Sequence, residues 1–263
     1  MHTDTAPLLD ARLSVTYGSQ PILQDIHLQI ASRGCTGLVG QSGSGKSTLS
    51  LALLGLLGSH ARVRGSILFE GSELLGQSER EWRQIRGRRI ALVLQSAASA
   101  LNPALRIESQ LKEAWQAHST EPWRAARPAA IELLRSFDLP ATDDFLHRYP
   151  SQVSVGQAQR ILIAMALLHR PALLIADEVT SAVDLLTQRE VLASLRRANT
   201  EWGTAVLLIT HDLLSVPELC TDLIVLENGR IVESGPCCRV LQEPAHPYTR
   251  RLIEALPVQM QSL

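Results

Sequence analysis

Short apolar runs and amphipathic stretches alternate along this chain, so strands and helices are predicted to follow one another. The first two runs, 8–16 and 22–30, alternate between apolar and polar positions and predict an antiparallel pair joined by a turn at 17–21. Because strands and helices then alternate, a mainly parallel sheet covered on both faces is expected. The other predicted strands are 35–39, 63–69, 90–94, 172–176, 205–210, 222–227 and 230–234. The predicted helices are 47–57, 78–86, 158–169, 187–202 and 248–256.

The stretch from 96 to 150 breaks this alternation. It contains no strand pattern, and 107–118 and 123–137 have the 3.6-residue period of amphipathic helices. Asp143 or Asp144 is placed to cap a short third helix. The sequence therefore predicts a helical subdomain inserted into an α/β domain.

A glycine-rich segment joins the predicted strand 35–39 to the predicted helix 47–57. Residues 40–48 (GQSGSGKST), here called the phosphate loop, fit the nucleotide-binding pattern GxxxxGK[ST] with no mismatch. Glycines let backbone N–H groups approach phosphate oxygens, and the helix N-terminus adds partial positive charge. An incidental Gly/Ser turn is the alternative, but a chance match in such a length is on the order of one per cent. We expect Lys46 to reach the β- and γ-phosphates and Ser47 to ligate Mg²⁺. The expected nucleotide ligands are Gly40, Ser42, Gly43, Gly45, Lys46, Ser47 and Thr48.

Polar side chains follow three further apolar runs. Asp177 and Glu178 close one run, His211 closes a second, and Gln95 closes a third. Because ligands of open α/β sheets bind at the carboxyl ends of strands, we expect these residues at the nucleotide. Asp177 is expected to hold Mg²⁺, and Gln95 to contact Mg²⁺ or water. Glu178 is expected to polarise the attacking water, and His211 to donate to the γ-phosphate. Taken singly, an acidic turn and a structural histidine are the alternatives.

Charge and composition narrow the class of protein. With 25 Lys and Arg against 26 Asp and Glu, the net charge of -1 does not suggest a nucleic-acid binder. The longest apolar stretches, 49–58 and 161–168, fall well short of the ~20 residues of a membrane span. The N-terminal segment has no apolar signal core, so the chain is expected to stay in the cytoplasm. The four cysteines show no CxxC spacing, which favours reduced thiols over a metal site or disulfides.

The order of these motifs resembles an ABC transporter ATPase subunit over almost the whole chain. Residues 153–157 (VSVGQ) stand where that family has its LSGGQ signature, and 181–184 (SAVD) resemble its D-loop. Tyr17 stands where the family often stacks an aromatic ring on adenine, although a turn tyrosine packed on the sheet is the alternative.

The resemblance implies a fold and a division of the chain. The fold is α/β, a P-loop NTPase (RecA-like) ABC ATPase core with an antiparallel β subdomain and a helical subdomain. The nucleotide-binding domain is expected at 1–235, with the helical subdomain inserted at about 96–157, and a short tail at 236–263.

The resemblance also implies partners. The active unit would be a dimer that sandwiches two Mg-ATP molecules, in which Ser154, Gly156 and Gln157 read the γ-phosphate of ATP bound to the other subunit. The expected partners are a second ABC ATPase subunit, two transmembrane permease subunits and a periplasmic or extracellular solute-binding protein, with no nucleic acid. The chain is then expected at the cytoplasmic face of the inner membrane, attached through the permease.

Two segments are similar to peptide and nickel importer ATPases. One is 95–103 (QSAASALNP), and the other is 243–252 (EPAHPYTRRL), which resembles that branch's HPYT motif. A proline-bounded turn leading into a docking helix is the physical interpretation of the second segment, and both interpretations can hold. Peptide-importing members often continue into a cysteine-bearing extension, whereas this chain stops at Leu263, so the nickel type is the more similar. The predicted function is ATP hydrolysis that powers uptake of nickel or metal chelates or short peptides.

Two departures from the family pattern stand out. One is Val179, which replaces the family's usual Pro after Glu178 and should relax the turn by removing a fixed φ. The other is in the signature. Val153 and Val155 replace its Leu and its first Gly, which puts a β-branched side chain where a phosphate should approach. We expect the partner's ATP site to be the weaker one of an asymmetric pair. Two alternatives are a soluble ABC-type ATPase without transport and a weakly catalytic regulatory subunit. A single cassette without a heptad run speaks against the first, and intact Glu178 and His211 speak against the second.

Overall fold

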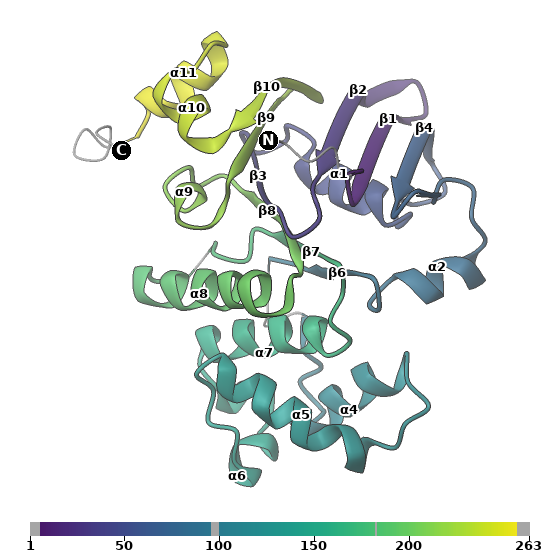
Figure 1. The fold of residues 1–263 in the computed structure, drawn as a ribbon, viewed down its shortest axis with the longest axis vertical. Coiled ribbons are helices and arrows are strands. Elements are labelled where there is room, and N and C mark those ends of the chain that lie inside the picture. The colour runs from purple at the N-terminus through teal and green to yellow at the C-terminus, as the bar shows by residue number, and fades with distance from the viewer. Residues whose placement is uncertain (1–5, 96–99, 182, 257–263) are drawn as a thin grey trace. The chain divides into compact units, whose positions relative to one another are not determined.

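The computed structural model of this chain describes residues 6–95, 100–181 and 183–256. It divides into two compact units, which are described separately below. The first unit is formed by 1–83 and 205–263, and the second by 84–204. Figure 1 labels the elements of both units.

The first unit holds a four-stranded antiparallel sheet in the order β2-β1-β4-β5. Along β1, apolar residues alternate with polar ones, and the apolar set is buried, as expected for a sheet with one face on the core. Tyr17 pairs with Gln20, so the connecting turn is only Gly18 and Ser19, shorter than the predicted turn at 17–21. The strands are β1 (Leu9–Tyr17), β2 (Gln20–Ile30), β4 (Ala61–Phe69) and β5 (Ser72–Glu73).

Four more strands of the first unit follow one another in the order β10-β9-β3-β8. Strand β3 runs parallel to β8 and to β9, whereas β9 and β10 form an antiparallel hairpin. Both β3 (sequence CTGLV) and β8 (sequence AVLLIT) are buried at every residue, which explains why their sequences are largely apolar. These strands are β3 (Cys35–Val39), β8 (Ala205–Thr210), β9 (Asp222–Glu227) and β10 (Arg230–Pro236). The later helices are α9 (Val216–Leu219), α10 (Cys237–Gln242) and α11 (Pro247–Glu254).

Helix α1 (Lys46–Leu53) ends earlier than the predicted 47–57. Gly55 adopts φ +60°, and the Leu56 N–H donates to the carbonyl oxygen of Leu51 at 2.9 Å, which is a glycine-terminated helix end. A Cβ at Gly55 would lie 2.7 Å from the ring of Trp82 in α2 (Glu79–Ile85). The predicted end of this helix was wrong because the apolar pattern continues past Gly55, whereas the helix itself ends before that glycine.

The second unit pairs β6 (Ile90–Val93) with β7 (Leu173–Asp177) in parallel and is otherwise helical. Helices α7 and α8 lie side by side in it (Figure 1). The short α6 begins after Thr142, whose hydroxyl accepts from the Phe145 N–H at 3.3 Å, so the cap is this threonine and neither predicted aspartate. The helices are α4 (Ile107–Gln116), α5 (Trp123–Ser136), α6 (Asp143–Leu146), the 3₁₀ turn Pro150–Gln152, α7 (Val155–Leu167) and α8 (Leu185–Trp202).

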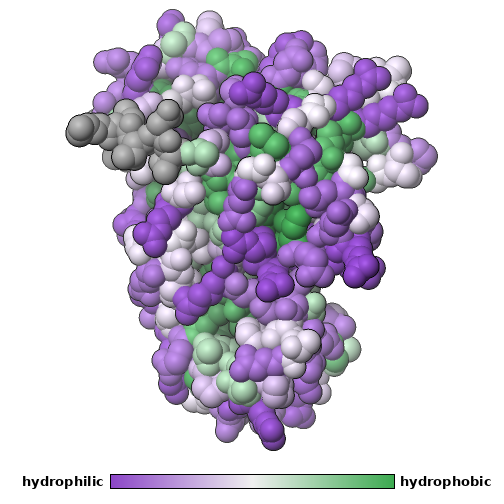
Figure 2. All heavy atoms as spheres, turned by 45° about the vertical axis from the view of Figure 1, so that its right-hand side comes forward, coloured by the Kyte–Doolittle hydropathy of each residue, from purple (hydrophilic) through white to green (hydrophobic). Residues whose placement is uncertain are grey.

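Hydrophilic side chains cover most of the face shown in Figure 2, as expected for a chain whose apolar residues fill its cores. Phe137 and Phe145 are among the largest fully buried side chains of the second unit, and Leu28 and Leu38 of the first. Among the described residues, we find no helix of the length and apolar character that crossing a membrane requires.

Candidate nucleotide-binding and hydrolysis site

The phosphate loop leaves the end of β3 and enters α1 through backbone conformations that only glycine adopts freely. Gly45 has φ +109° and caps α1, and Gly43 has φ +80° with open space where a side chain would point. At Gly40, a Cβ would lie 2.2 Å from the carbonyl oxygen of Leu226. The N–H groups at the start of α1 are thereby exposed on an open concave turn, which is the geometry that binds phosphate.

Lys46 is held inside this loop. Its side chain is buried, with the residue only 5% exposed, and its Nζ donates to the carbonyl oxygens of Gly40 at 2.8 Å and Gln41 at 3.0 Å. Ser44 is also buried, and its Oγ has no hydrogen-bond partner among the described residues. A buried cation and an unsatisfied hydroxyl on a ring of backbone donors fit a polyphosphate group. Ser44 was not among the predicted ligands, and only its place inside the loop could have suggested it.

The hairpin β9–β10 supports the phosphate loop from outside. The Gly229 N–H donates to the carbonyl oxygen of Ser44 at 2.9 Å, and the carbonyl of Gly229 accepts from the Gln24 N–H at 2.8 Å. A side chain at Gly229 would meet the carbonyl oxygen of Ile22 at 2.0 Å. The Asn228-Gly229 pair between the two strands is typical of a hairpin turn, but no feature of the sequence indicated that the hairpin would hold the loop.

Two more predicted residues belong to the first unit. Tyr17 is the last residue of β1 and 38% exposed, so its ring is accessible for stacking. His211 follows β8 directly and is exposed. The turn after it is held by Asp212, which accepts from the Leu214 N–H at 3.0 Å. His211 is thus presented at the carboxyl end of a fully buried strand, as expected.

The second unit brings Gln95, Asp177 and Glu178 to one edge. Strands β6 and β7 are parallel neighbours with Val93 opposite Ala176, so the residues that follow them leave the sheet on the same side. Asp177 is the last residue of β7 and 4% exposed, whereas Gln95 is exposed. A buried carboxylate at a strand end suits a divalent cation.

Glu178 adopts the left-handed backbone conformation, with φ +50°. The turn is closed by Ser181, whose N–H and hydroxyl donate to the carbonyl oxygen of Glu178 at 3.1 and 2.6 Å. Non-glycine residues in this conformation are uncommon, but six other described residues of this chain share it, so the conformation alone does not identify a functional site. The sequence pattern identified Glu178 but not this backbone conformation, and Val179 was expected to relax the turn. Val179 is buried, and the turn is formed without a proline.

The signature segment 153–157 contains the start of helix α7, which was predicted to begin only after this segment. Helix α7 begins at Val155, three residues before the predicted 158–169. Ser154 caps it: its Oγ accepts from the Gln157 N–H and the Gln157 Oε1 accepts from the Ser154 N–H, both at 3.1 Å. This reciprocal capping box has an S-x-x-Q spacing that could have located the helix start.

Val155 and Gly156 have opposite surroundings. The Val155 side chain is on the surface, with the residue 61% exposed, so most of its bulk faces outward. Gly156 is buried, and a Cβ there would lie 2.6 Å from the Cγ2 of Thr187 in α8. The D-loop ends at Asp184, which caps α8 by accepting from the Leu186 and Thr187 N–H groups at 3.0 Å. Ala182 of the D-loop lies outside the described residues, as do 96–99 of the segment after Gln95.

The predicted Mg²⁺ ligands come from both units. Ser47 is exposed in the first turn of α1, and Gln95 and Asp177 belong to the second unit. Within the described ranges, no three His, Cys, Asp or Glu side chains are gathered as a metal site. The assignment of these three residues to Mg²⁺ stays a prediction.

Two of the cysteines are kept as unreactive thiols by burial. All four are free; Cys35, Cys220 and Cys237 are buried and Cys238 is exposed. Burial, reinforced by neighbouring thiols, raises the pKa of Cys220, and burial raises the pKa of Cys237 to about 11. These two thiols stay protonated at neutral pH and are poor nucleophiles.

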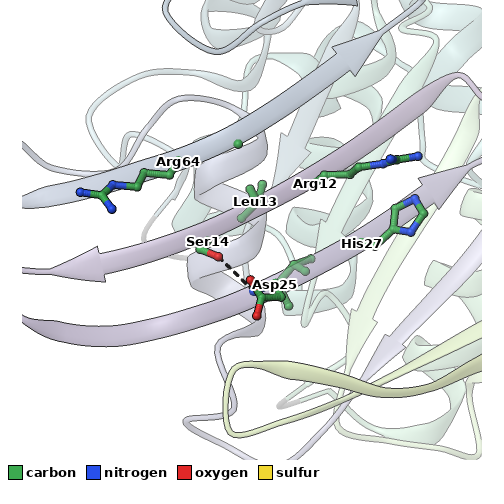
Figure 3. Close-up of a pocket in the computed structure, with 8 residues that line it drawn as sticks. Arg12, Leu13, Ser14, Asp25, His27 and Arg64 are labelled. Carbon is green, nitrogen blue, oxygen red and sulfur yellow. Dashed lines mark hydrogen bonds between the residues drawn. The ribbon is translucent and has the colours of Figure 1, made fainter.

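A hollow of about 430 Å³ lies on the polar face of the antiparallel sheet. Figure 3 shows Arg12 beside His27 on neighbouring strands and Arg64 extending the other way. The Asp25 N–H donates to the Ser14 Oγ at 3.0 Å. None of the predicted site residues lines this hollow, so it is separate from the phosphate loop.

Comparison with known proteins agrees with this geometry. The ABC transporter family model matches residues 23–181. The chain is 36% identical over 256 residues to the oligopeptide transport ATP-binding protein OppD of Haemophilus influenzae, covering 95% of this chain and 79% of that protein. It is 40% identical over 259 residues to a putative peptide import ATP-binding protein of Brucella abortus, covering 96% of this chain and 78% of that protein.

A solved structure gives the same fold. The chain superposes on cbiO1 from Clostridium perfringens, described as part of the ABC transporter complex cbiONQ, with a TM-score of 0.80 and 24% identity. The superposition covers 95% of this chain and 94% of that one. This likeness confirms the predicted P-loop ABC ATPase fold, and with the sequence matches it shows that the chain belongs to the ABC transporter family as an ATP-hydrolysing subunit.

Proposed function

We propose that this chain powers an inner-membrane importer of short peptides by binding and hydrolysing Mg-ATP at the cytoplasmic face of the membrane. The observation that carries the proposal is its similarity, over 95% or more of its length, to one protein named for oligopeptide transport and one named for peptide import. The tail segment 243–252 supports it, because it resembles a motif of that branch. Two permease subunits, a solute-binding protein and a second ATPase subunit complete the proposed complex.

We assign roles in this reaction to the residues described above. The phosphate loop and Tyr17 bind ATP, while Ser47, Gln95 and Asp177 hold Mg²⁺, which compensates the phosphate charge. Glu178 orients and polarises the attacking water, and His211 donates to the γ-phosphate. The nucleotide-binding domain is proposed to span 1–235, with the helical subdomain at about 96–157 and the tail at 236–263.

Peptide import is favoured here over the nickel or metal-chelate import that the short tail predicts. The two relatives described above carry peptide names, and neither carries a nickel name. Substrate choice belongs to the permease and the solute-binding protein, so uptake by cells has to decide between these cargoes.

Uptake in cells tests the cargo. In cells carrying Lys46→Ala in place of the native chain, we expect uptake of a labelled short peptide to fall to background while uptake of labelled nickel, alone or with a chelator, is unchanged. The reason is that an ATPase without its phosphate-loop cation no longer drives the permease. The chain's only other lysine, Lys112, is exposed on α4, and Lys112→Ala is the matched control with native uptake. Loss of nickel uptake alone would move the chain to the metal branch, and no change in either would favour the ATPase without transport.

The signature supports a heterodimer with unequal ATP sites. Val155 stands at the first position of α7, beside the N–H groups that would face the partner's γ-phosphate, and its side chain projects to the surface. A β-branched side chain there keeps a phosphate away from the helix N-terminus. The defect would fall on the partner's nucleotide, while this chain's own site keeps Lys46, Glu178 and His211.

Changing Val155 measures this asymmetry. In a complex in which Glu178→Gln silences this chain's site, Val155→Gly should raise the remaining ATP turnover about three- to tenfold, the worth of roughly one recovered phosphate contact. Val155→Ala should lie between the native and Gly variants. Helix propensity alone would rank the alanine variant highest, because Ala favours a helix more than Gly does. Turnover that is unchanged, or highest with alanine, would contradict the asymmetric pair.

A further inference from the structure

The C-terminal tail contacts the phosphate loop through one side chain. Tyr248 lies in the first turn of α11, is 4% exposed, and accepts a hydrogen bond on its hydroxyl oxygen from the Gln41 N–H at 2.9 Å. The two residues are 207 positions apart in sequence and belong to the same unit. The tail motif, whose residues alone indicate no chemical role, therefore lies against the site that binds phosphate.

The start of α11 is fixed independently of the loop. Glu233 of β10 accepts hydrogen bonds from the N–H groups of Ala245 at 2.8 Å and His246 at 3.0 Å. Burial alone would raise the pKa of Glu233, but the hydrogen bonds it accepts lower that pKa below its ordinary value, so the carboxylate is ionised at neutral pH. His246 then caps the helix, its Nδ1 accepting from the Tyr248 N–H at 3.2 Å. These three hydrogen bonds hold the turn that places Tyr248 against the phosphate loop.

The peptide groups of Gln41 are held at both ends. Its N–H donates to Tyr248, and its carbonyl accepts from the Lys46 Nζ at 3.0 Å and from the Ser44 N–H at 3.2 Å. When Lys46 turns to phosphate oxygens, its bond to this carbonyl is lost. The bond from the Gln41 N–H to Tyr248 does not involve the Lys46 ammonium, so a turn of Lys46 toward phosphate does not break it.

We propose that Tyr248 is a positioning residue that holds the first turn of the phosphate loop in its binding conformation before and after ATP enters. The inference rests on the assignment of 40–48 to phosphate binding. Without the hydroxyl, the Gln41 N–H loses its partner, and the loop has to be ordered by the nucleotide itself. Ordering a loop on binding lowers affinity without changing the bound state that reacts.

Removal of the hydroxyl separates this role from simple packing. Tyr248→Phe keeps the ring and should raise the KM for ATP and the Kd for Mg-ADP about three- to tenfold, as for loss of one neutral hydrogen bond. At saturating ATP, kcat should stay within about twofold of native, because the reacting groups are untouched. Arg251→Gln in the same helix is the control: it removes an exposed ion pair with Glu227 at 3.4 Å and the guanidinium that lies 5.9 Å from the centroid of the Tyr248 ring, but it keeps the hydroxyl, so ATP affinity should not change.

The possible outcomes test the role of Tyr248 separately from the assignment of 40–48 to phosphate binding. If Tyr248→Phe lowers the melting temperature but leaves the KM for ATP and the Kd for Mg-ADP as in the native chain, the residue is structural only and the inference is wrong. A fall in kcat with unchanged KM would overturn it as well. If Lys46→Ala also binds Mg-ADP normally, the assignment of the phosphate loop itself fails.

Discussion

Lys46→Ala should lower ATP turnover by about 10²- to 10³-fold, the usual cost of removing one preorganised charge from a developing transition state. The native ammonium is already buried in the loop, on the carbonyl oxygens of Gly40 and Gln41, so it needs only a short rotation to reach a phosphate. Binding of Mg-ADP should weaken as well, because the same cation pairs with the β-phosphate. Both quantities are measured on the purified complex, by phosphate release and by titration calorimetry.

Lys46→Arg is the informative companion variant. The guanidinium keeps the charge, but it is larger and planar, whereas the loop holds a compact ammonium buried against the carbonyl oxygens of Gly40 and Gln41. We expect it to be nearly as inactive as the alanine variant. Lys112→Ala should behave as the native chain in the same assays. Turnover within about threefold of native for Lys46→Ala would contradict the role of this residue in charge compensation, and the same result for Lys46→Arg would contradict the limit that the loop sets on the size of the cation.

Strands were easier to predict than helix ends in this chain. The sequences of β3 and β8 are largely apolar and contain no charged residue, which predicts buried strands, and the alternation along β1 assigns its two faces. The strand ends then located Asp177 and His211. Helix ends depend on single residues: Gly55 ends α1, and Ser154 starts α7. Both signals were present in the sequence as a glycine and an S-x-x-Q spacing.

Contacts between distant segments could not be predicted from the sequence. The phosphate loop matched its pattern without mismatch, yet the pattern says nothing of what supports it. Gly229 and Tyr248 contact the loop at Ser44 and Gln41 from positions far along the chain. Both contacts use backbone groups of the loop, so no side-chain pattern encodes them. Their partners are visible only once β9, β10 and α11 are folded beside the loop.

The backbone of Glu178 explains why that carboxylate, and not Asp177, is the candidate base. Asp177 continues β7 and is buried, which suits a ligand of a cation. Glu178 turns out of the strand with φ +50° and is partly exposed, which suits a group that meets water. A single change of backbone direction thus gives two adjacent carboxylates different surroundings. Because surroundings set the protonation and the contacts of a carboxylate, the two residues can have different chemical roles.

Glu178→Gln should abolish hydrolysis while sparing ATP binding. The amide has the same shape and also tolerates the turn, but it does not polarise or deprotonate water, so turnover should fall about 10²- to 10⁴-fold, the contribution of a general base. The partner's site is silenced by Lys→Ala in its own phosphate loop, so that all measured turnover belongs to this chain. The Kd for ATP should stay within about twofold of native, which separates this variant from Lys46→Ala.

The control for this variant is Glu201→Gln, which removes only an exposed ion pair with Arg197 at 3.7 Å on α8 and should leave turnover unchanged. If the native chain itself shows no turnover in that complex, the chain is a regulatory subunit. If native turnover is substantial and Glu178→Gln keeps a third or more of it, the general base is another group. An amide cannot accept the proton of the attacking water, so hydrolysis that depends on the Glu178 carboxylate would be lost in this variant.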